Sequence, residues 1–357
     1  MNDKSVFART RYVILYHQFC PDGWCALAVA DMWLSKKYSR DLLQYIPVMA
    51  GKTDAVVDQL VRDYGKLSED DQPLILSFDL NFTYWGAKKL LRHFPYAHIL
   101  DHHLTTELCF VKPDDETDEE FAKYMSIVNS GAITYDKSIS GAMLAWKYFY
   151  GVAPAPALVL YIQDKDLWEW KLPNSREVNA GLSETLTTAP AEGPMTRTQT
   201  TMWAVQEWGK YLLNDDWVET ARSNGAMIMN IQNRTIKRLV RDGALRNIPV
   251  DNVVHRAFVI NTSMYISELG EYVYMLEGDT PGTYKYDFVV IWRYDQVRDV
   301  VCVSLRARGD YPIDLAALSQ TFEWTKDGKR TTGGGHKSAA GFECDLRTFF
   351  LWIGGTL

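Results

Sequence analysis

The chain has 357 residues, of which 47% are hydrophobic and 23% are charged. It is too long for one ordinary hydrophobic core and suits two domains, and it is too apolar to be intrinsically disordered. The formal net charge is −7 at pH 7. There is thus no global basic field for holding long nucleic acid, although a short oligonucleotide would need only a local basic pocket.

The N-terminal residues and the cysteines favour a cytoplasmic protein. The opening segment MNDKSVFARTRYVILY lacks the apolar stretch and the cleavage site of a secretory signal. The longest apolar runs, such as residues 288–292, are far shorter than a membrane span. Five cysteines without a CxxC pair are typical of reduced thiols. We therefore expect a cytoplasmic location and no membrane partner.

The first half of the chain alternates short apolar runs with helical patterns. The apolar runs are typical of strands buried on both faces, and they cover residues 12–16, 74–78, 98–100 and 158–162. Helical patterns lie between and around them, at residues 24–37, 53–64, 84–93 and 141–149. This alternation predicts an α/β domain with a mostly parallel sheet.

Each apolar run ends in polar residues that can carry chemistry, namely His17 with Asp22, Asp79, Asp101 with His102 and His103, and Asp164. In parallel sheets ligands bind beyond the carboxyl ends of the strands, where the loops converge. Carboxylates with imidazoles suit Mn²⁺ or Mg²⁺. Two such ions about 3.5–4 Å apart can generate a hydroxide and clamp the oxygens of a phosphoryl transfer. Taken singly, each residue also has a local alternative, such as capping a helix or holding a turn.

The second half of the chain changes character twice. Residues 185–201 are rich in Thr, Ala, Pro and Gly and predict a loop, and helical patterns follow at residues 202–213 and 216–242. Later patterns predict strands at 257–261, 286–294 and 300–307, the last two as a hairpin, and a helix at 313–322. We predict a catalytic domain at 1–190, a helical linker at 191–249 and a smaller α/β substrate-binding domain at 250–357. The active site would lie in the cleft between the two domains.

Five segments in chain order resemble the motifs of the DHH phosphoesterase superfamily. The tripeptide from Asp101, after a short apolar strand, is similar to the signature that names the family, and HQFCPDGWCALAVA from His17 resembles its first motif. The SFDL segment around Asp79 resembles the second motif, and YIQDKDLW around Asp164 resembles the fourth. GGGHKSAAGF from Gly333 is similar to the signature of the C-terminal DHH-associated domain, subfamily one. Such ordered motifs are far more specific than a lone tripeptide.

This resemblance implies a role for each of the polar residues. Asp79 would bridge two metal ions, Mn²⁺ by preference with Mg²⁺ as the alternative. His103 would lie beside the scissile phosphate, and Asp101 would orient the neighbouring histidine. The remaining metal ligands would be His17, Asp22, His102 and Asp164.

Two positions leave alternatives open. Asp166 is a near neighbour of Asp164, and we prefer Asp164 because it comes first after the apolar run. Many members of the family carry an aspartate two residues before the position of Asp22, where this chain has Cys20. A thiolate can bind a metal ion, whereas a small buried thiol would leave one of the two metal sites altered, weak or empty.

The resemblance and the glycines also identify candidate substrate-binding residues, which are Arg306, Ser304, Gly333, Gly334, Gly335 and His336. Glycines allow a backbone whose amide groups point at an anion, and His336 adds an imidazole donor, although a plain glycine turn is the alternative. Arg306 is similar to the phosphate-binding arginine of the family, and Ser304 lies near it. Arg308 is a weaker candidate.

We therefore expect a phosphoric ester hydrolase that cuts short oligonucleotides or dinucleotides through a metal-activated hydroxide, like the oligoribonucleases (nanoRNases) of the family. The alternatives are a single-strand exonuclease, a pyrophosphatase or polyphosphatase, and a nucleotide-binding regulatory protein with an impaired metal site. The partner would be a small phosphorylated or nucleotide substrate or short single-stranded nucleic acid, and a homodimer is left open. One basic helix face would support the exonuclease alternative. Such a face could be formed by Arg234, Lys237, Arg238 and Arg241, and an ordinary solvated face is the other interpretation.

Overall fold

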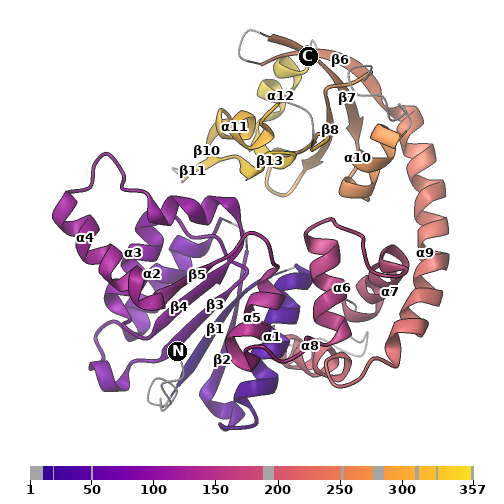
Figure 1. The fold of residues 1–357 in the computed structure, drawn as a ribbon. Coiled ribbons are helices and arrows are strands. Elements are labelled where there is room, and N and C mark those ends of the chain that lie inside the picture. The colour runs from indigo at the N-terminus through magenta and orange to yellow at the C-terminus, as the bar shows by residue number, and fades with distance from the viewer. Residues whose placement is uncertain are drawn as a thin grey trace. The chain divides into compact units, whose positions relative to one another are not determined.

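The computed structural model describes residues 11–18, 20–49, 51–187, 197–250, 253–275, 285–309, 313–326 and 329–354. By proximity of Cα atoms the chain divides into two compact units, Met1–Ile228 and Met229–Leu357. Each unit has a sheet and hydrophobic cores of its own (Figure 1). The predicted α/β class, with a parallel sheet in the first domain and a second sheet-containing domain, is therefore confirmed.

The first unit is built on a sheet with the strand order β2-β1-β3-β4-β5. Its strands are β1 (Tyr12–His17), β2 (Leu43–Val48), β3 (Leu74–Phe78), β4 (Ala97–Asp101) and β5 (Ile133–Tyr135). All neighbouring strands in it run parallel. From β1 the chain adds β2 on one side and then returns to add β3 on the other. The order therefore reverses at the boundary between β1 and β3, which is the switch point of the sheet.

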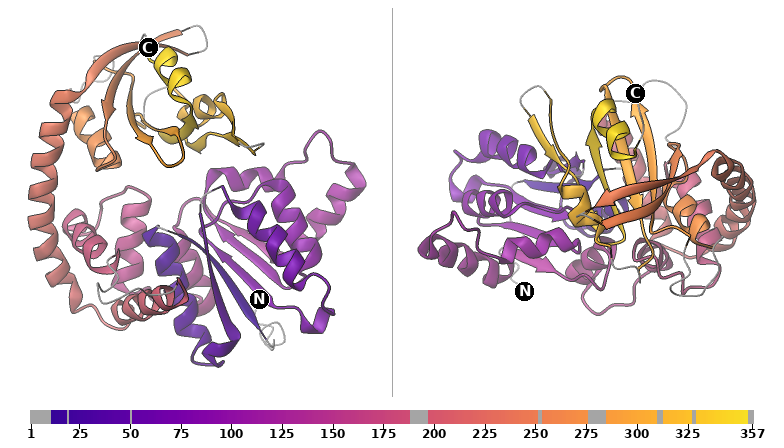
Figure 2. Two further views of the ribbon diagram at one scale, coloured as in Figure 1. Left: turned by 180° about the vertical axis from the view of Figure 1, so that it is seen from behind. Right: turned by 90° about the horizontal axis from the view of Figure 1, so that it is seen from above.

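Helices cover both faces of this sheet (Figure 2). Because side chains of a strand alternate between faces, Tyr12, Ile14 and Tyr16 enter one core while Val13 and Leu15 enter the other. The first core includes residues of α1 (Pro21–Leu34), α5 (Gly141–Tyr150), α6 (Ala157–Asp166), α7 (Ser175–Thr187) and α8 (Arg197–Tyr211). The second includes residues of α2 (Thr53–Tyr64), α3 (Tyr84–His93) and α4 (Asp118–Ile127). Shorter segments are η1 (Arg40–Leu42), η2 (Glu69–Asp71), η3 (Leu104–Phe110) and η4 (Val128–Ala132).

Most predicted elements of this unit are present, but one was assigned the wrong type. Residues 158–162 belong to helix α6 rather than to a strand. Leu158, Val159 and Ile162 are its buried apolar residues, and a short apolar run does not by itself distinguish a buried helix from a buried strand. The predicted loop at 185–201 is partly helical, because α7 continues to Thr187 and α8 begins at Arg197. Residues 188–196 lie outside the described residues.

The second unit contains a mixed sheet with the order β12-β13-β9-β8-β7-β6. Its strands are β6 (Ala244–Val250), β7 (Val253–Asn261), β8 (Phe288–Asp295), β9 (Val300–Arg306), β12 (Gly334–His336) and β13 (Ala339–Cys344). A separate pair is formed by β10 (Glu323–Lys326) and β11 (Lys329–Thr332). Helices of this unit are α10 (Ile266–Met275), α11 (Leu315–Gln320) and α12 (Leu346–Trp352). The predicted hairpin is confirmed, because β8 and β9 pair antiparallel.

The boundary between the two units falls inside α9 (Trp217–Leu239), which η5 (Val240–Asp242) follows. The predicted helix at 216–242 is thus present. The predicted helical linker, however, ends in strand β6, which begins at Ala244. Pro249 is tolerated there because β6 is an edge strand of the sheet. The domain limits at 190 and 249, and the cleft between domains, stay predictions.

No described helix combines the length and the apolar character that crossing a bilayer requires.

Candidate metal centre

The switch point of the parallel sheet is where the strand order predicts a binding site. In open α/β sheets the loops on either side of the reversal diverge beyond the carboxyl ends of the strands and leave a crevice. His17 is the last residue of β1, and Asp79 directly follows β3, the strand next to β1. Asp101 ends β4 and is followed by His102 and His103. Three of the sequence motifs therefore meet at this edge.

Asp79 occupies the centre of the site in an unusual backbone conformation. Its φ is 57°, a left-handed value that residues other than glycine rarely adopt. Its amide donates a hydrogen bond to the carbonyl of Leu100, 3.1 Å away, which continues the pairing of β3 with β4 beyond the strand. The Asp79 side chain is 1% exposed. Its two carboxylate oxygens face different histidines, Oδ2 at 3.3 Å from His17 Nδ1 and Oδ1 at 3.3 Å from His102 Nε2.

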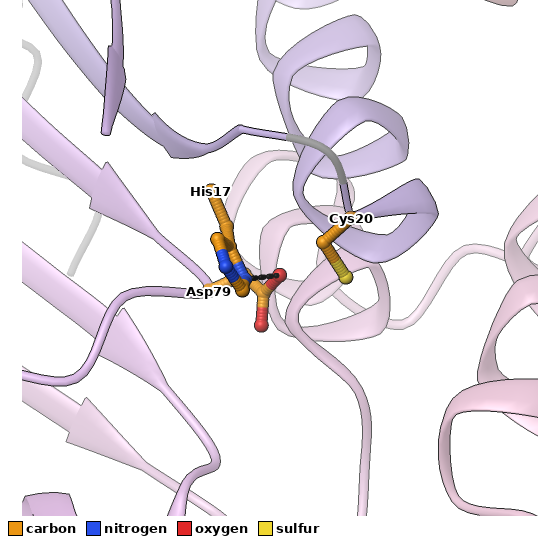
Figure 3. Close-up of side chains that lie close together, drawn as sticks. All are labelled: His17, Cys20 and Asp79. Carbon is orange, nitrogen blue, oxygen red and sulfur yellow. Dashed lines mark ion pairs between the residues drawn. The ribbon is translucent and has the colours of Figure 1, made fainter. Parts of the chain in front are cut away.

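The first group of possible ligands consists of His17, Cys20 and Asp79, whose donor atoms all lie within 4.8 Å of one another. Figure 3 shows the three side chains converging from the end of β1, the start of α1 and the turn after β3. His17 Nδ1 and Asp79 Oδ2 are buried and have no hydrogen-bond partner among the described residues. Since buried polar atoms nearly always have a partner, this pair fits a bound cation.

The second group consists of Asp22, His102 and Asp166, again with donor atoms within 4.8 Å of one another. His102 Nε2 lies 3.4 Å from Asp166 Oδ2 and 3.8 Å from Asp22 Oδ2. Asp79, His102 and His103 also form such a group. Asp79 and His102 thus connect the two groups, as residues between two neighbouring ions would.

Asp22 is fixed by the start of a neighbouring helix. It lies in the first turn of α1, and its carboxylate accepts hydrogen bonds from the amides of Gly141 at 2.5 Å and Ala142 at 2.9 Å. These amides open α5, whose N-cap Ser140 accepts from Met143 N. A carboxylate at a helix N-terminus is favoured by the helix dipole. The amides of α5 therefore hold a protein carboxylate, and Ser140 is an ordinary N-cap.

The second histidine of the DHH tripeptide is oriented by the first residue. His103 Nδ1 lies 2.7 Å from Asp101 Oδ1. Thr106, which the sequence did not single out, donates its hydroxyl hydrogen to the other carboxylate oxygen of Asp101. Burial alone would lower the pKa of His103, but the hydrogen bond and charge of Asp101 and the charge of Asp79 raise it. The contact with Asp101 fixes the orientation of the His103 ring.

The crowding of acidic and imidazole groups sets the pKa directions. Burial alone would lower the pKa of His102, but its hydrogen bond to Asp79 and the nearby carboxylates raise it to about 10. Burial would raise the pKa of Asp79, but the contacts with His102 and His17 hold it below its usual range. Burial and neighbouring carboxylates raise the pKa of Asp22, and burial raises that of Asp166 to about 6. A divalent cation would relieve this concentration of negative charge.

The structure favours Asp166 over Asp164 as the residue near the candidate metal centre, and the ligand role of either stays a prediction. The carboxylate of Asp164 accepts hydrogen bonds from the amides of Lys171 at 2.8 Å and Leu172 at 3.2 Å, so it closes the turn after α6. Asp166, at the last position of α6, is the residue that faces His102. Residues 158–162 are helical, so the argument from a strand edge does not apply to Asp164.

The candidate substrate-binding residues of the second unit share one face of its sheet. Arg306 pairs with Ala339 of β13, which in turn pairs with His336 of β12. Ser304 lies two residues before Arg306 and therefore on the same face. Residues that pair laterally also share a face, so Ser304, Arg306 and His336 lie on one surface across three strands.

Small residues keep this surface open between the polar side chains. Ser304 pairs with Gly341, which pairs with Gly334. Gly335 has a φ of 141°, and a Cβ there would lie 2.5 Å from the carbonyl oxygen of Ala339. A Cβ at Gly333 would lie 2.2 Å from the carbonyl oxygen of Ser319. These two glycines are therefore needed for close backbone approach, whatever ligand the surface binds.

Arg306 is partly held within the unit. Its guanidinium donates to Ser267 Oγ of α10 at 3.2 Å and to its neighbouring carbonyl, that of Leu305, at 2.8 Å. Burial lowers the pKa of Arg306 from the usual arginine range. The side chain still carries its positive charge, since arginine stays charged in proteins. Ser267 is a residue that sequence reasoning missed, because nothing in the pattern of α10 marks it.

The comparisons with known proteins add weak likenesses only. No family model matches the chain. Uncharacterized protein R106 of Acanthamoeba polyphaga mimivirus is 20% identical over 344 residues, which cover 94% of this chain and 68% of that protein.

Several solved structures are similar over most of the chain, but at low TM-score. An uncharacterized protein from Helicobacter pylori G27 is 16% identical with a TM-score of 0.42, covering 94% of both chains. The pGpG-specific phosphodiesterase PggH from Vibrio cholerae is 10% identical with a TM-score of 0.42, covering 96% of this chain and 98% of that one. RecJ from Thermus thermophilus, in complex with Mn²⁺, is 13% identical with a TM-score of 0.41, covering 97% of this chain and 51% of that one. Likenesses of this size assign neither a family nor an activity.

The fold and the site together define an α/β protein with a candidate metal centre at the switch point of its parallel sheet. The donor set is made of imidazole, carboxylate and one thiol. Such groups fit divalent cations.

Proposed function

We propose that this chain is a metal-dependent phosphoesterase that hydrolyses phosphodiester bonds in short oligonucleotides or dinucleotides. The observation that carries the proposal is the position of Asp79, whose two oxygens face His17 and His102 at the same distance of 3.3 Å. A carboxylate shared between two imidazole-containing groups is the arrangement that a bridging ligand needs. The ordered resemblance to the DHH motifs supports the same reaction class.

Each group of residues then has a distinct task. Divalent cations bound here would supply an activated water and positive charge opposite the phosphoryl oxygens. Asp79 would contribute one carboxylate oxygen to each of the two ligand groups. Asp22, His102 and Asp166 would complete the second group. We assign to His103, held by Asp101, the donation of a hydrogen bond to the reacting phosphate. A donor fixed in advance is most effective where negative charge develops.

The surface formed by Arg306, Ser304 and His336 would bind a further phosphate or terminal nucleotide of the substrate. A guanidinium and an imidazole can both donate charge-assisted hydrogen bonds to phosphate. The glycines at 333–335 allow the backbone to approach an anion closely. The formal net charge of −7 supports a compact substrate rather than a long polymer.

The test is a substrate panel on the full chain, stripped of metal and reloaded with Mn²⁺ or Mg²⁺. The panel contains dinucleotides, cyclic dinucleotides, short RNA and DNA, and pyrophosphate. We expect turnover of the dinucleotide or short oligonucleotide that depends on added metal. Asp79→Ala should abolish it, because a bridging ligand serves both ions.

Two results would contradict the proposal. Near-wild-type activity of Asp79→Ala would remove Asp79 from the reaction. Stoichiometric metal binding without turnover of any substrate would favour the alternative of a nucleotide-binding regulatory protein.

A further inference from the structure

Cys20 occupies the N-cap position of α1, where Ser, Thr, Asp and Asn are the usual residues. Its backbone is extended, with φ −106° and ψ 124°, and its sulfur faces the amide of Gly23 in the first turn of the helix. The sulfur also lies within 4.8 Å of donor atoms of His17 and Asp79 (Figure 3).

Three of the other four cysteines show what a packing thiol looks like in this protein. Cys25, Cys109 and Cys344 are buried members of hydrophobic cores. Cys20, like Cys302, belongs to none of the hydrophobic clusters formed by the described residues. Its surroundings are polar, so the interpretation as a small buried packing thiol does not describe it.

The charges around Cys20 are those of a cation site. Its sulfur lies beside the carboxylate of Asp79, and Asp22 and Asp166 belong to the adjoining ligand group. Three carboxylates near a thiol are unfavourable for a thiolate on its own. A divalent cation reverses this local field and deprotonates a coordinating thiol.

The partners of Cys20 are also incomplete without an ion. Asp79 Oδ2 and His17 Nδ1 are 3.3 Å apart and form an ion pair, and beyond this contact neither atom has a hydrogen-bond partner among the described residues. Asp79 is 1% exposed, so solvent does not satisfy its oxygen. An ion bound between sulfur, nitrogen and oxygen would give all three groups a ligand bond.

We propose that Cys20 is a thiolate ligand of the ion held by His17 and Asp79, and that it makes this position selective for Zn²⁺ or Co²⁺ over Mn²⁺ or Mg²⁺. On binding, the S–H bond breaks, its proton passes to solvent, and the sulfur lone pair forms the bond to the metal. No atom changes oxidation state in this step. The inference rests on the metal centre of the proposed function and is independent of its substrate.

The difference between the two ligand groups is the chemical basis of this selectivity. Thiolates bind Zn²⁺ and similar borderline ions, whereas carboxylates suit Mn²⁺ and Mg²⁺. The second group, Asp22, His102 and Asp166, contains no sulfur. The centre is therefore asymmetric, with a softer first position and a harder second one.

The experiment is a Co²⁺ titration of the metal-free full chain, followed by absorption spectroscopy and elemental analysis. We expect a sulfur-to-cobalt charge-transfer band in the near ultraviolet that saturates at one equivalent. In Cys20→Ser this band should be absent. The Zn²⁺ affinity of one position should also fall by on the order of 10–100-fold or more, because losing a ligand should weaken binding at least as much as losing the hydrogen-bond partner of a ligand does. In Cys20→Asp the band should also be absent, while Mn²⁺ affinity rises.

Cys302→Ser is the matched control, because Cys302 is another partly buried thiol and lies in the other unit on β9. It should keep the band. Circular dichroism of each variant shows whether it is folded, and Cys20→Asp replaces Cys20→Ser if the serine variant is not.

The outcomes separate this inference from the proposed function. A charge-transfer band that persists in both Cys20 variants, or no band with Co²⁺ fully bound to wild type, overturns the thiolate assignment even if phosphodiesters are cleaved. A band that requires Cys20 supports the assignment even if no substrate on the panel is turned over, in which case only the proposed function fails.

Discussion

Asp79 combines a strained backbone with a carboxylate that faces both ligand groups. A left-handed conformation costs a residue with a side chain about 1–2 kcal/mol, less for aspartate than for most. The hydrogen bond from the Asp79 amide to the carbonyl of Leu100 holds Asp79 in that conformation. The turn directs its carboxylate toward the end of β1. Strain of this kind is concentrated at functional sites. Here it places one carboxylate between His17 and His102.

At the same scale, mutations of Asp166 and Asp164 should have different effects, the first on metal affinity and the second on stability. Asp166→Ala should lower metal affinity by on the order of 10–100-fold or more, and with it activity, because Asp166 faces His102 at 3.4 Å. Asp164→Ala should instead destabilise the protein by about 1–3 kcal/mol, because two partly buried amides lose their acceptor. Metal content after dialysis and urea unfolding measure the two effects.

Asp164→Asn is the matched control, because it keeps one acceptor oxygen and should destabilise the protein less than Asp164→Ala. The assignment would be reversed if folded Asp164→Ala lost metal while Asp166→Ala retained it.

His98, outside the site, should contribute to the pH dependence of stability. Burial lowers its pKa from the usual histidine value near 6.5, and its ring lies 5.7 Å from that of Tyr148. The unfolded chain therefore binds a proton at a higher pH than the folded chain does. Folding stability must then be fully present above pH about 6.5 and fall as the pH drops below it.

The comparison that tests this uses His98→Gln, which removes the titrating group. The unfolding free energy of metal-free wild type should fall more steeply between pH 7 and pH 5 than that of His98→Gln, while activity at pH 7 is retained. Parallel curves would show that His98 does not carry this dependence.

At the scale of elements, two helices approach the site through glycines in their first turns. A Cβ at Gly23 in α1 would lie 2.5 Å from the carbonyl oxygen of His17. A Cβ at Gly141 in α5 would lie 2.7 Å from Asp79 Cβ and 2.8 Å from Asp22 Oδ2. Contacts this short have no room for a methyl group, so the helices can come this close only with glycine.

We therefore predict that Gly141→Ala displaces Asp22 and Asp79. The variant should lose about 1–3 kcal/mol of stability through overpacking and bind Mn²⁺ more weakly. Gly209→Ala in α8 is the matched control, since no atom lies within 4 Å of a Cβ there. It should be stabilised by about 0.4–1 kcal/mol. Thermal unfolding and metal titration of both variants decide whether the close approach matters.

The shared face of β9, β13 and β12 predicts a binding defect rather than a metal defect. Arg306→Ala should raise KM strongly while metal content stays at the wild-type level, because the proposed role of the lost group is to bind phosphate and no proposed metal ligand is removed. Arg293→Ala, an exposed arginine that pairs with Asp295 on the neighbouring strand β8, is the control and should leave KM unchanged. Loss of metal from Arg306→Ala would show that Arg306 supports metal binding rather than substrate binding.

For the whole molecule, the distribution of charge decides between short and long substrates. The formal net charge is −7. Four exposed cations nevertheless lie close together in and after the last turns of α9, namely Arg234, Lys237, Arg238 and Arg241. Their spacing places them on one helix face, opposite the buried Ile236. A basic face of this size is more often solvated than functional.

We predict a higher kcat/KM for a dinucleotide than for a single strand of a few dozen nucleotides, with weak salt dependence. Replacing the four cations of α9 and η5 by glutamine should not change the dinucleotide rate. Faster cleavage of the long strand with steep salt dependence, lost in the glutamine variant, would favour the exonuclease alternative.

The sequence by itself determined the parallel sheet and most of the residues of the candidate metal centre. Strands such as Leu74–Phe78 are continuous apolar runs, and His17, Asp79 and His102 come at fixed short distances after their strands. Because parallel strands end at one edge, local sequence order was enough to bring these residues together. The half-buried edge strand β2, with Pro47 in its interior, carries no such pattern and was missed.

Only the tertiary structure decided the remaining ligands and the second surface. Asp164 and Asp166 stand two residues apart at the end of one helix, and which of them faces His102 depends on how α6 packs. Arg306 and His336 share a face only because β13 pairs between their strands. Cys20 was left open between ligand and packing thiol by the sequence, and its distance to His17 and Asp79 favours the ligand. Sequence periodicity constrains neighbours along one element, whereas these contacts are set by packing between elements far apart in the chain.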